Sequence, residues 1–227
     1  MQPAVSVVIP FFDEEGTLEE LHRRLSAVLD DYGEPYEILF VDDGSTDGGP
    51  AVLKRLVDED PAVGLVRFRR NFGKSAALDA GFRRVRGRVV ITMDADLQDD
   101  PDEIPRLLAA LEERELDLVS GWKKKRHDPV GKTLPSKVFN FVVSRLTGLR
   151  LNDFNCGLKA YRAEALADLE LYGELHRYIP VLVEWHGFRV GEIPVRHHPR
   201  KWGRSKYGVE RMAKGFFDLL TVILLRS

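Results

Sequence analysis

The sequence contains a single cysteine, Cys156, among its 227 residues. One thiol cannot form an intrachain disulfide, and it cannot build a cysteine-cluster metal site. The formal net charge is only −2, which provides no global field of the kind that draws a protein to nucleic acid. We therefore expect neither a disulfide scaffold nor a partner made of nucleic acid, and the scarcity of cysteine agrees with a reducing compartment.

Long hydrophobic runs are also missing. The most apolar segment, GFFDLLTVILLRS at 215–227, is far shorter than the roughly 20 residues that a membrane-spanning helix needs. The first residues, MQPAVSVVIPFFDEE, lack a basic region and reach acids early, so we expect a strand there and not a signal peptide. No G-x-G-x-x-G follows this strand, which disfavours a dinucleotide-dependent oxidoreductase.

Apolar runs rich in β-branched residues alternate with stretches of helical periodicity along the chain. We expect strands at 4–10, 36–43, 63–68, 88–94 and 116–121 with helices between them, then a basic loop (123–136), a helix (136–146), an irregular stretch (148–162), a helix (179–187) and a strand (188–195). This alternation predicts an α/β fold with a mostly parallel sheet and helices on both faces.

Polar side chains gather where four of the expected strands end. These strands lead into PFFDEE, DDGSTD, DADLQDD and GWKKKR. Ligands of parallel α/β sheets bind outside the carboxyl ends of the strands. We therefore predict that the functional site lies at this edge.

The acidic run after the fourth of these strands divides into two parts. Asp100 and Pro101, followed by two further acids, suit the start of a helix, because a capping carboxylate and acids in the first turn complement the helix dipole. Asp94, Asp96 and Gln98 occupy alternate positions, so in an extended chain their side chains converge on one side. Such oxygen donors suit Mg2+ or Mn2+, which takes one or two carboxylates plus substrate phosphates.

Six segments occur together and in order between residues 5 and 208: VSVVIPFFDEEGTL, EILFVDDGSTDGG, RNFGKSAALDAGF, MDADLQDDPDEIP, DFNCGLKAYR and HHPRKWGRSKYG. With these segments, which extend over about nine-tenths of the chain, it resembles the family 2 inverting glycosyltransferases of the GT-A (Rossmann-like) fold. Within that family it is similar to the polyprenyl-phosphate sugar synthases, the group of dolichyl-phosphate mannose synthase and its bacterial undecaprenyl-phosphate relatives.

This resemblance implies a metal-dependent inverting glycosyltransferase. A UDP- or GDP-linked sugar would be the donor, a polyprenyl phosphate (dolichyl or undecaprenyl) the acceptor, and Mg2+ or Mn2+ the cofactor. The second pKa of a phosphate monoester is about 6, so the acceptor is mostly ionised near neutrality and needs no dedicated general base. Cations that place it beside the anomeric carbon are then sufficient.

The resemblance also assigns residues to the site. Asp96 and Gln98 would be the metal ligands, and the catalytic residues would be Asp96, Arg200 and Lys206. The nucleotide-sugar site would comprise Pro10, Phe12, Glu14, Val41, Asp43, Asp94, Ala95, Asp96, Gln98, Lys123, Arg200 and Lys206. The acceptor phosphate would meet Lys132, Ser136, His176 and Arg177.

Several positions depart from the family pattern or have two interpretations. The family often has Tyr at the position of Phe12, and Arg at those of Lys123 and Lys132. Lysine keeps the charge but loses the bidentate fork, so an ordinary solvated basic loop is the alternative for both lysines. Asp153 suits a structural turn as well as catalysis. His176, or the glutamate two residues before it, is the alternative general base.

Basic residues concentrate near the C-terminus. Seven lie between Arg196 and Lys214, against the single acid Glu210, directly before the apolar run. Near an anionic leaflet each Lys or Arg contributes about 1 kcal/mol. We expect a catalytic domain at 1–206 and an amphipathic juxtamembrane helix at 207–227, on the cytoplasmic face of a membrane, either peripheral or anchored by segments beyond this sequence. A packed helix beside a phosphate-binding loop is the alternative.

Two other functions compete with transfer to a lipid phosphate. One keeps the fold and the nucleotide sugar but uses a soluble or polymeric saccharide as acceptor. The other is an inactive nucleotide- or lipid-binding scaffold, against which the acidic set around Asp96 argues.

Overall fold

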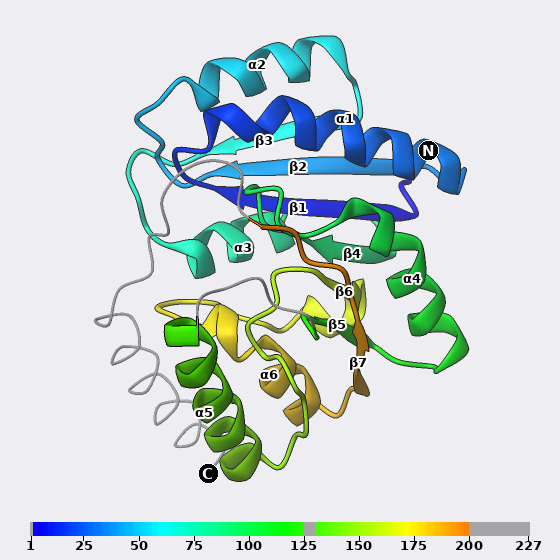
Figure 1. The fold of residues 1–227 in the computed structure, drawn as a ribbon. Coiled ribbons are helices and arrows are strands. Elements are labelled where there is room, and N and C mark those ends of the chain that lie inside the picture. The colour runs from blue at the N-terminus through cyan, green and yellow to red at the C-terminus, as the bar shows by residue number, and fades with distance from the viewer. Residues whose placement is uncertain (1, 125–129, 200–227) are drawn as a thin grey trace.

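The structure, a computed structural model, describes residues 2–124 and 130–199, apart from the side chains of 130–137. Within these residues a seven-stranded sheet with the order β3-β2-β1-β4-β6-β5-β7 forms the centre of the molecule (Figure 1). The strands are β1 (Val5–Phe11), β2 (Tyr36–Asp42), β3 (Val63–Arg67), β4 (Val89–Thr92), β5 (Leu118–Trp122), β6 (Lys159–Arg162) and β7 (Val190–Pro194). All pairings are parallel except those of β6, which is antiparallel to β4 and β5. The predicted fold class is confirmed.

Helices cover both faces of the sheet, as the alternation of strands and helices predicted. The helices are α1 (Glu15–Tyr32), α2 (Gly49–Glu59), α3 (Lys74–Phe82), α4 (Ile104–Glu113), α5 (Val130–Thr147) and α6 (Ile179–Trp185), with 3-10 turns η1 (Pro101–Glu103), η2 (Ala163–Leu166) and η3 (Leu175–Arg177). Successive strand residues serve opposite layers: Val7 packs in the core under α1, α2 and α4, and Val8 in the core under α3, α5 and α6. Strands buried on both sides explain why the β1 sequence is almost continuously apolar.

Two predicted elements were wrong. Residues 159–162 fell in the expected irregular stretch, but they form β6. A four-residue strand whose partners lie far away in sequence has no periodicity of its own, so only the tertiary pairing determines it. Helix α5 begins at Val130, although 130–136 was expected to be a loop. Gly131 and Pro135 weaken the helical signal of that segment.

The order of the strands reverses beside β1. The chain adds β2 and β3 on one side of β1 and then returns to its other side with β4. The loops that follow β1 and β4 therefore diverge from neighbouring strands, which is the geometry at which α/β sheets bind ligands.

No helix of the described part is long and apolar enough to cross a membrane. The predicted helix at 207–227, and the boundary at residue 206, lie outside the described residues.

Candidate active site

The loops after β1 and β2 form one hydrogen-bonded unit. Asp13 has a φ of 52°, and its carboxylate accepts from the Thr46 amide at 2.7 Å. The Asp13 amide donates to Ser45 Oγ at 3.0 Å, and the Glu15 amide donates to Asp47 Oδ2 at 2.9 Å. Asp and Asn tolerate a left-handed conformation better than most residues, which fits an acid at position 13.

Four predicted nucleotide-binding residues lie in or beside this unit. Pro10 is buried in β1, while Phe12 and Glu14 are half-buried in the loop that follows. Val41 is fully buried in the core beneath α3. Its side chain supports the edge of the sheet from within.

Asp43 holds the segment before α3 against the end of β2. Its carboxylate accepts from the Phe72 amide at 2.7 Å and from the Gly73 amide at 2.9 Å. The neighbouring Gly44 has a φ of 76°, and a Cβ there would lie 2.4 Å from the carbonyl carbon of Arg70. The turn at 42–44 and the segment 70–73 therefore pack backbone to backbone, which only glycine permits.

The first residue of α3 brings a cation into the site. Lys74 forms an ion pair with Asp94, which lies just beyond the end of β4. Burial by itself raises the pKa of the Asp94 carboxyl, but the charges of Lys74 and Lys123 outweigh it and hold this pKa far below its usual range. Lys74 was not among the predicted site residues. Its only signal was its place in the RNFGKSAALDAGF segment, in the loop after a parallel strand.

Asp94 is also confined from the other side. Thr92 Oγ1 donates to the Gly157 carbonyl at 2.8 Å, which pulls the DFNCGLKAYR segment onto the end of β4. A Cβ at Gly157 would lie 2.7 Å from both Cγ and Oδ2 of Asp94. A hydrogen at position 157 is therefore what lets the backbone touch this carboxylate.

The next residues do not continue as an extended chain, so the predicted convergence of alternate side chains was wrong. Ala95 and Asp96 lie in a turn, Leu97 has a φ of 59°, and Asp96 Oδ1 accepts from the Gln98 amide at 3.0 Å. A carboxylate that bonds the amide two residues ahead favours a turn over a strand. The turn, and not strand alternation, keeps Asp96 and Gln98 close together.

A returning segment fastens Gln98 in place. The His198 amide donates to the Gln98 carbonyl at 2.7 Å, and Gln98 Nε2 donates to the His198 carbonyl at 3.3 Å. With its nitrogen in this bond, the amide of Gln98 presents oxygen as its ligand atom. Residues 197 and 198 thus contact this loop, and Arg200 follows them closely in the sequence. The predicted Arg200 and Lys206 themselves lie outside the described residues.

Lys123, at the end of β5, points at a buried acid. Its Nζ lies 3.3 Å from Asp99 Oδ1, and the Asp99 side chain is only 1% exposed. Burial alone would lower the pKa of Lys123, but the Asp99 charge, with Asp153 and Asp94 nearby, holds it well above its ordinary value. The interpretation of Lys123 as an ordinary solvated loop lysine was therefore wrong. Burial also raises the pKa of the adjacent Cys156 thiol to about 12, which makes this thiol unreactive near neutrality.

The predicted acceptor residues fall into two groups. His176 contacts the start of α3: its Nδ1 lies 2.9 Å from Ser75 Oγ, which also accepts from the His176 amide at 3.0 Å. Burial, with the charges of Lys74 and Arg177, holds the pKa of His176 well below its ordinary value. Arg177 pairs with Glu174 at 2.9 Å. The other group, Lys132 and Ser136, belongs to α5, where the structure does not describe their side chains.

The second half of the acidic run behaves as a helix start, as predicted. Asp100 caps η1 by accepting from the Asp102 amide at 3.2 Å. It also accepts from Arg24 at 2.8 Å, and its other oxygen lies 3.0 Å from His198 Nε2. Burial by itself would raise the pKa of the Asp100 carboxyl. Hydrogen bonds from His198 and the Asp102 amide, together with the charges of two arginines, outweigh burial and hold this pKa below its ordinary value. The charge of Asp100 is thus balanced by neighbouring cations of the protein, which suits a capping role.

The turn at 95–98 offers a hard cation two oxygen ligands, the carboxylate of Asp96 and the amide oxygen of Gln98. Among the described residues no group of three or more His, Cys, Asp or Glu side chains is placed to hold a metal ion. Mg2+ and Mn2+ commonly take few protein ligands and complete their coordination with phosphate oxygens. The donor set therefore fits a metal that binds together with a diphosphate.

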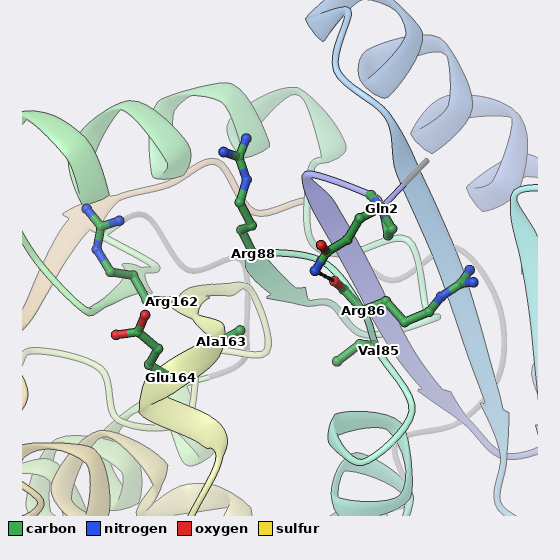
Figure 2. A pocket seen from close by; sticks show the side chains of 9 residues that line it. Gln2, Val85, Arg86, Arg88, Arg162, Ala163 and Glu164 are labelled. Atoms are coloured by element: carbon green, nitrogen blue, oxygen red, sulfur yellow. Dashed lines mark hydrogen bonds between the residues drawn. The ribbon is translucent and has the colours of Figure 1, made fainter.

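One cavity lies away from these residues. It has a volume of about 710 Å³ and is lined by residues just before β1, just before β4, and at and just after the end of β6, among them Arg86, Arg88 and Arg162. Because β6 is antiparallel, all three segments meet at the amino edge of the parallel strands (Figure 2). No predicted site residue lines this cavity, and two of its arginines already pair with acids, Arg86 with Glu37 and Arg162 with Glu112.

This α/β sheet, with an acidic turn and basic side chains beyond the carboxyl ends of β4 and β5, is the architecture of the GT-A class. The chain belongs to glycosyl transferase family 2, which matches residues 6–170. It is 42% identical over 223 residues to a dodecaprenyl-phosphate galacturonate synthase of Rhizobium johnstonii, covering 96% of this chain and 66% of that protein. It is 38% identical over 220 residues to an undecaprenyl-phosphate 4-deoxy-4-formamido-L-arabinose transferase of Salmonella paratyphi A, covering 96% of this chain and 67% of that protein. The chain thus spans about two thirds of the length of these relatives.

Solved structures show the same fold. A mannosyltransferase from Pyrobaculum calidifontis in complex with GDP-Man and Mn2+ superposes with a TM-score of 0.65 at 22% identity, covering 100% of this chain and 69% of that one. Glucosyl-3-phosphoglycerate synthase from Mycobacterium tuberculosis with Mn2+ and UDP-glucose gives a TM-score of 0.71 at 20% identity, covering 99% of this chain and 79% of that one. The predicted family and fold are confirmed.

Proposed function

We propose that the chain is the catalytic part of an inverting, metal-dependent glycosyltransferase that moves a sugar from a nucleotide sugar to a polyprenyl phosphate. The observation that carries this proposal is the Asp94–Gln98 turn, fixed beyond the carboxyl end of β4 by Lys74, Gly157 and His198. The named activities of the two most similar relatives reported above support a polyprenyl-phosphate acceptor. The ligands of the two solved structures support a nucleotide sugar and a divalent metal.

The leaving group is a nucleoside diphosphate, so catalysis requires that its developing charge be stabilised. Asp96 and Gln98 would hold a divalent cation, which would supply Lewis-acid stabilisation of the diphosphate. Lys123, kept cationic by Asp99, adds a fixed positive charge at the same edge. Arg200 and Lys206 are proposed to reach the diphosphate from the segment that follows His198.

The acceptor needs positioning more than activation. A phosphate monoester with a second pKa of about 6 is mostly dianionic near pH 7, so its oxygen attacks the anomeric carbon without giving up a proton to a base. The pKa of His176 is held well below its ordinary value, so this side chain is neutral there and meets the acceptor as a hydrogen-bond partner. We propose that Arg177, Lys132 and Ser136 complete the acceptor site.

We propose that the protein acts at a membrane. A polyprenyl acceptor resides in a bilayer, and the basic segment after Arg196 precedes an apolar run. Positive residues beside an apolar segment favour the cytoplasmic side. We propose a catalytic domain at 1–206 and a juxtamembrane helix at 207–227 on the cytoplasmic face. The transfer assay described next distinguishes Mg2+ from Mn2+ as the cofactor.

Transfer from labelled nucleotide sugars tests the proposal. Purified protein with Mn2+ or Mg2+ is offered a panel of UDP- and GDP-sugars with undecaprenyl phosphate, dolichyl phosphate or free saccharides. We expect metal-dependent transfer to a lipid phosphate from at least one donor, with inversion at the anomeric carbon. Transfer to a free saccharide alone would replace the acceptor, whereas nucleotide binding with no turnover on any acceptor would indicate an inactive scaffold.

A further inference from the structure

Helix α5 exposes apolar side chains in an unusual concentration. Six large hydrophobic side chains of the described residues are exposed, and three of them, Val138, Phe141 and Leu146, belong to this one helix. Their exposed fractions are 56%, 71% and 49%. Scattered single residues of this kind are normal at protein surfaces, but a cluster marks an interaction site.

The three residues share one face. Positions 138, 141, 145 and 146 follow the i, i+3, i+7, i+8 spacing that forms a single stripe on a helix. Arg145, the remaining residue of this stripe, is also exposed. Figure 1 places α5 at the periphery of the fold. We name Val138, Phe141, Arg145 and Leu146 the α5 outer face.

The opposite face of α5 attaches the helix to the domain. Val143 is fully buried, and the Phe139 ring lies 5.7 Å from the ring of Tyr178. Asn140 Nδ2 donates to the Asn152 carbonyl at 2.6 Å, and Thr147 also lies on this buried side. The inner face is thus attached to the domain by both apolar and polar contacts, so the three exposed apolar side chains of the outer face are not needed to hold the helix in place.

The charge of this region has one sign. The sequence from 129 to 152 contains Lys132, Lys137, Arg145 and Arg150 and no Asp or Glu, in a chain whose net charge is −2. An apolar stripe within a basic, acid-free segment is the composition of helices that lie in the interface of an anionic bilayer.

We propose that the α5 outer face docks on the surface of an anionic lipid bilayer, with Phe141 inserted among the lipids. The helix begins seven residues after Lys123, so docking through this face would keep the donor edge within a seven-residue chain segment of the docked helix. This inference rests on the proposed lipid acceptor. It makes α5 a membrane contact in addition to the segment at 207–227.

A site-specific fluorescent label tests this docking. Cys156 is buried and its thiol has a pKa of about 12, so a cysteine introduced at the surface is labelled selectively in the full chain. Phe141→Cys and the control Tyr32→Cys, each carrying the environment-sensitive dye NBD, are mixed with vesicles of phosphatidylcholine alone or with phosphatidylglycerol added. Tyr32 is also an exposed aromatic residue, but it lies at the end of α1.

With vesicles that contain phosphatidylglycerol, we expect the emission of the dye at position 141 to shift to the blue and to be quenched by a lipid-borne quencher. The dye at position 32 should show neither change. In flotation, Val138→Ser with Phe141→Ser should weaken binding to these vesicles about tenfold, since two apolar side chains no longer enter lipid, while Tyr32→Ser binds like the wild type. Unchanged dye emission at position 141 with vesicles overturns the proposal. A shift that depends on protein concentration without vesicles also overturns it, and assigns the face to a second copy.

The proposed function is measured separately. A short-chain, water-soluble prenyl phosphate serves as acceptor for the Val138→Ser, Phe141→Ser variant. Transfer to this acceptor at the wild-type rate, with vesicle binding lost, supports docking through α5. Absence of transfer by the wild type to any lipid phosphate would refute the proposed function. The vesicle experiments would still decide whether the α5 outer face docks on a bilayer.

Discussion

At the scale of single residues, Asp94 shows how the site is built. Its carboxylate pairs with Lys74 on one side and touches the Gly157 backbone on the other. The ion pair fixes the charge, and the glycine fixes the position. The acid therefore stays ionised and in place without a ligand, which reduces the reorganisation that ligand binding requires.

Gly157→Ala should displace this carboxylate. The added Cβ would lie 2.7 Å from Asp94 Cγ, so Asp94 must move, and we expect kcat/KM for the nucleotide sugar to fall at least about tenfold. Gly64→Ala is the matched control, because its Cβ meets only the end of the Leu39 side chain at 3.0 Å. Steady-state kinetics and thermal melting of both variants decide between a site effect and a general loss of stability. Equal kinetics for the two variants would refute the role of Gly157.

The buried pair of Lys123 and Asp99 makes a prediction about stability. Removal of one member of a buried ion pair leaves the other charge uncompensated and costs about 3 kcal/mol. Asp99→Asn should lower the free energy of unfolding in urea by about that amount. In a double-mutant cycle, Lys123→Met combined with Asp99→Asn should be less destabilised than the sum of the single variants. Additive losses would mean that the two side chains do not interact.

The lowered pKa of His176 should make the stability of the fold depend on pH. Burial and the nearby cations keep this histidine neutral in the folded protein, while the unfolded chain binds a proton below about pH 6.5. The unfolded state therefore gains more protons as the pH falls through this value, and folding stability decreases by up to about 1.4 kcal/mol per pH unit. His176→Gln should remove this decline between pH 6.5 and 5, as measured by urea unfolding, whereas His186→Gln should retain it. A wild-type stability that stays constant over this range would contradict the prediction.

At the scale of elements, the site depends on loops that hold one another. The carboxylate of Asp43, just after β2, accepts hydrogen bonds from the two backbone amides before α3. The start of α3 in turn supplies Lys74 and Ser75 to the site. The position of the α3 start is thus set by a residue 30 positions earlier.

Asp43→Asn should loosen this segment. An amide side chain offers one acceptor oxygen and no charge, where the carboxylate offers two oxygens. The Gly73 amide therefore loses its 2.9 Å bond to Oδ2 and keeps at most the 3.2 Å bond to the oxygen that it shares with the Phe72 amide. We expect hydrogen exchange over 71–75 to accelerate about tenfold, while exchange in β1 stays as in the wild type. Unchanged protection at 71–75 would show that Asp43 serves the nucleotide alone.

Most regular elements could be predicted from the sequence, but the contacts between distant elements could not. The apolar run of β1 is a local signal, and this strand, expected at 4–10, was predicted within one residue. The buried Leu18, Leu21 and Leu25 of α1 likewise follow a local helical spacing, which agrees with the helix expected after this strand. β6 could not be found, because its pairing with β4 joins residues about 70 positions apart and leaves no local pattern. For the same reason the acids of the site were predicted, whereas the contacts of Lys74 and Gly157 with Asp94 became visible only in the fold.

At the scale of the whole molecule, the two edges of the sheet have different characters. At the carboxyl edge the Asp94–Gln98 turn, Lys123 and His176 lie within reach of one another's charges. The cavity at the amino edge contains none of these residues (Figure 2). The chemistry is thus concentrated where the order of the strands reverses, and α5, attached beyond β5, carries the surface proposed to meet the lipid.

The most direct test of the central claim is a calorimetric titration of UDP and GDP into the wild type, Asp96→Asn and Asp102→Asn, with Mn2+ and with EDTA. Asp102 is the matched control, since it is an exposed acid of the same run, beyond the turn. We expect one of the two nucleotides to bind the wild type and Asp102→Asn only with Mn2+, and to bind Asp96→Asn at least about tenfold more weakly. Binding to Asp96→Asn with wild-type affinity, or binding that is indifferent to EDTA, would contradict the assignment of this turn as the metal and diphosphate site.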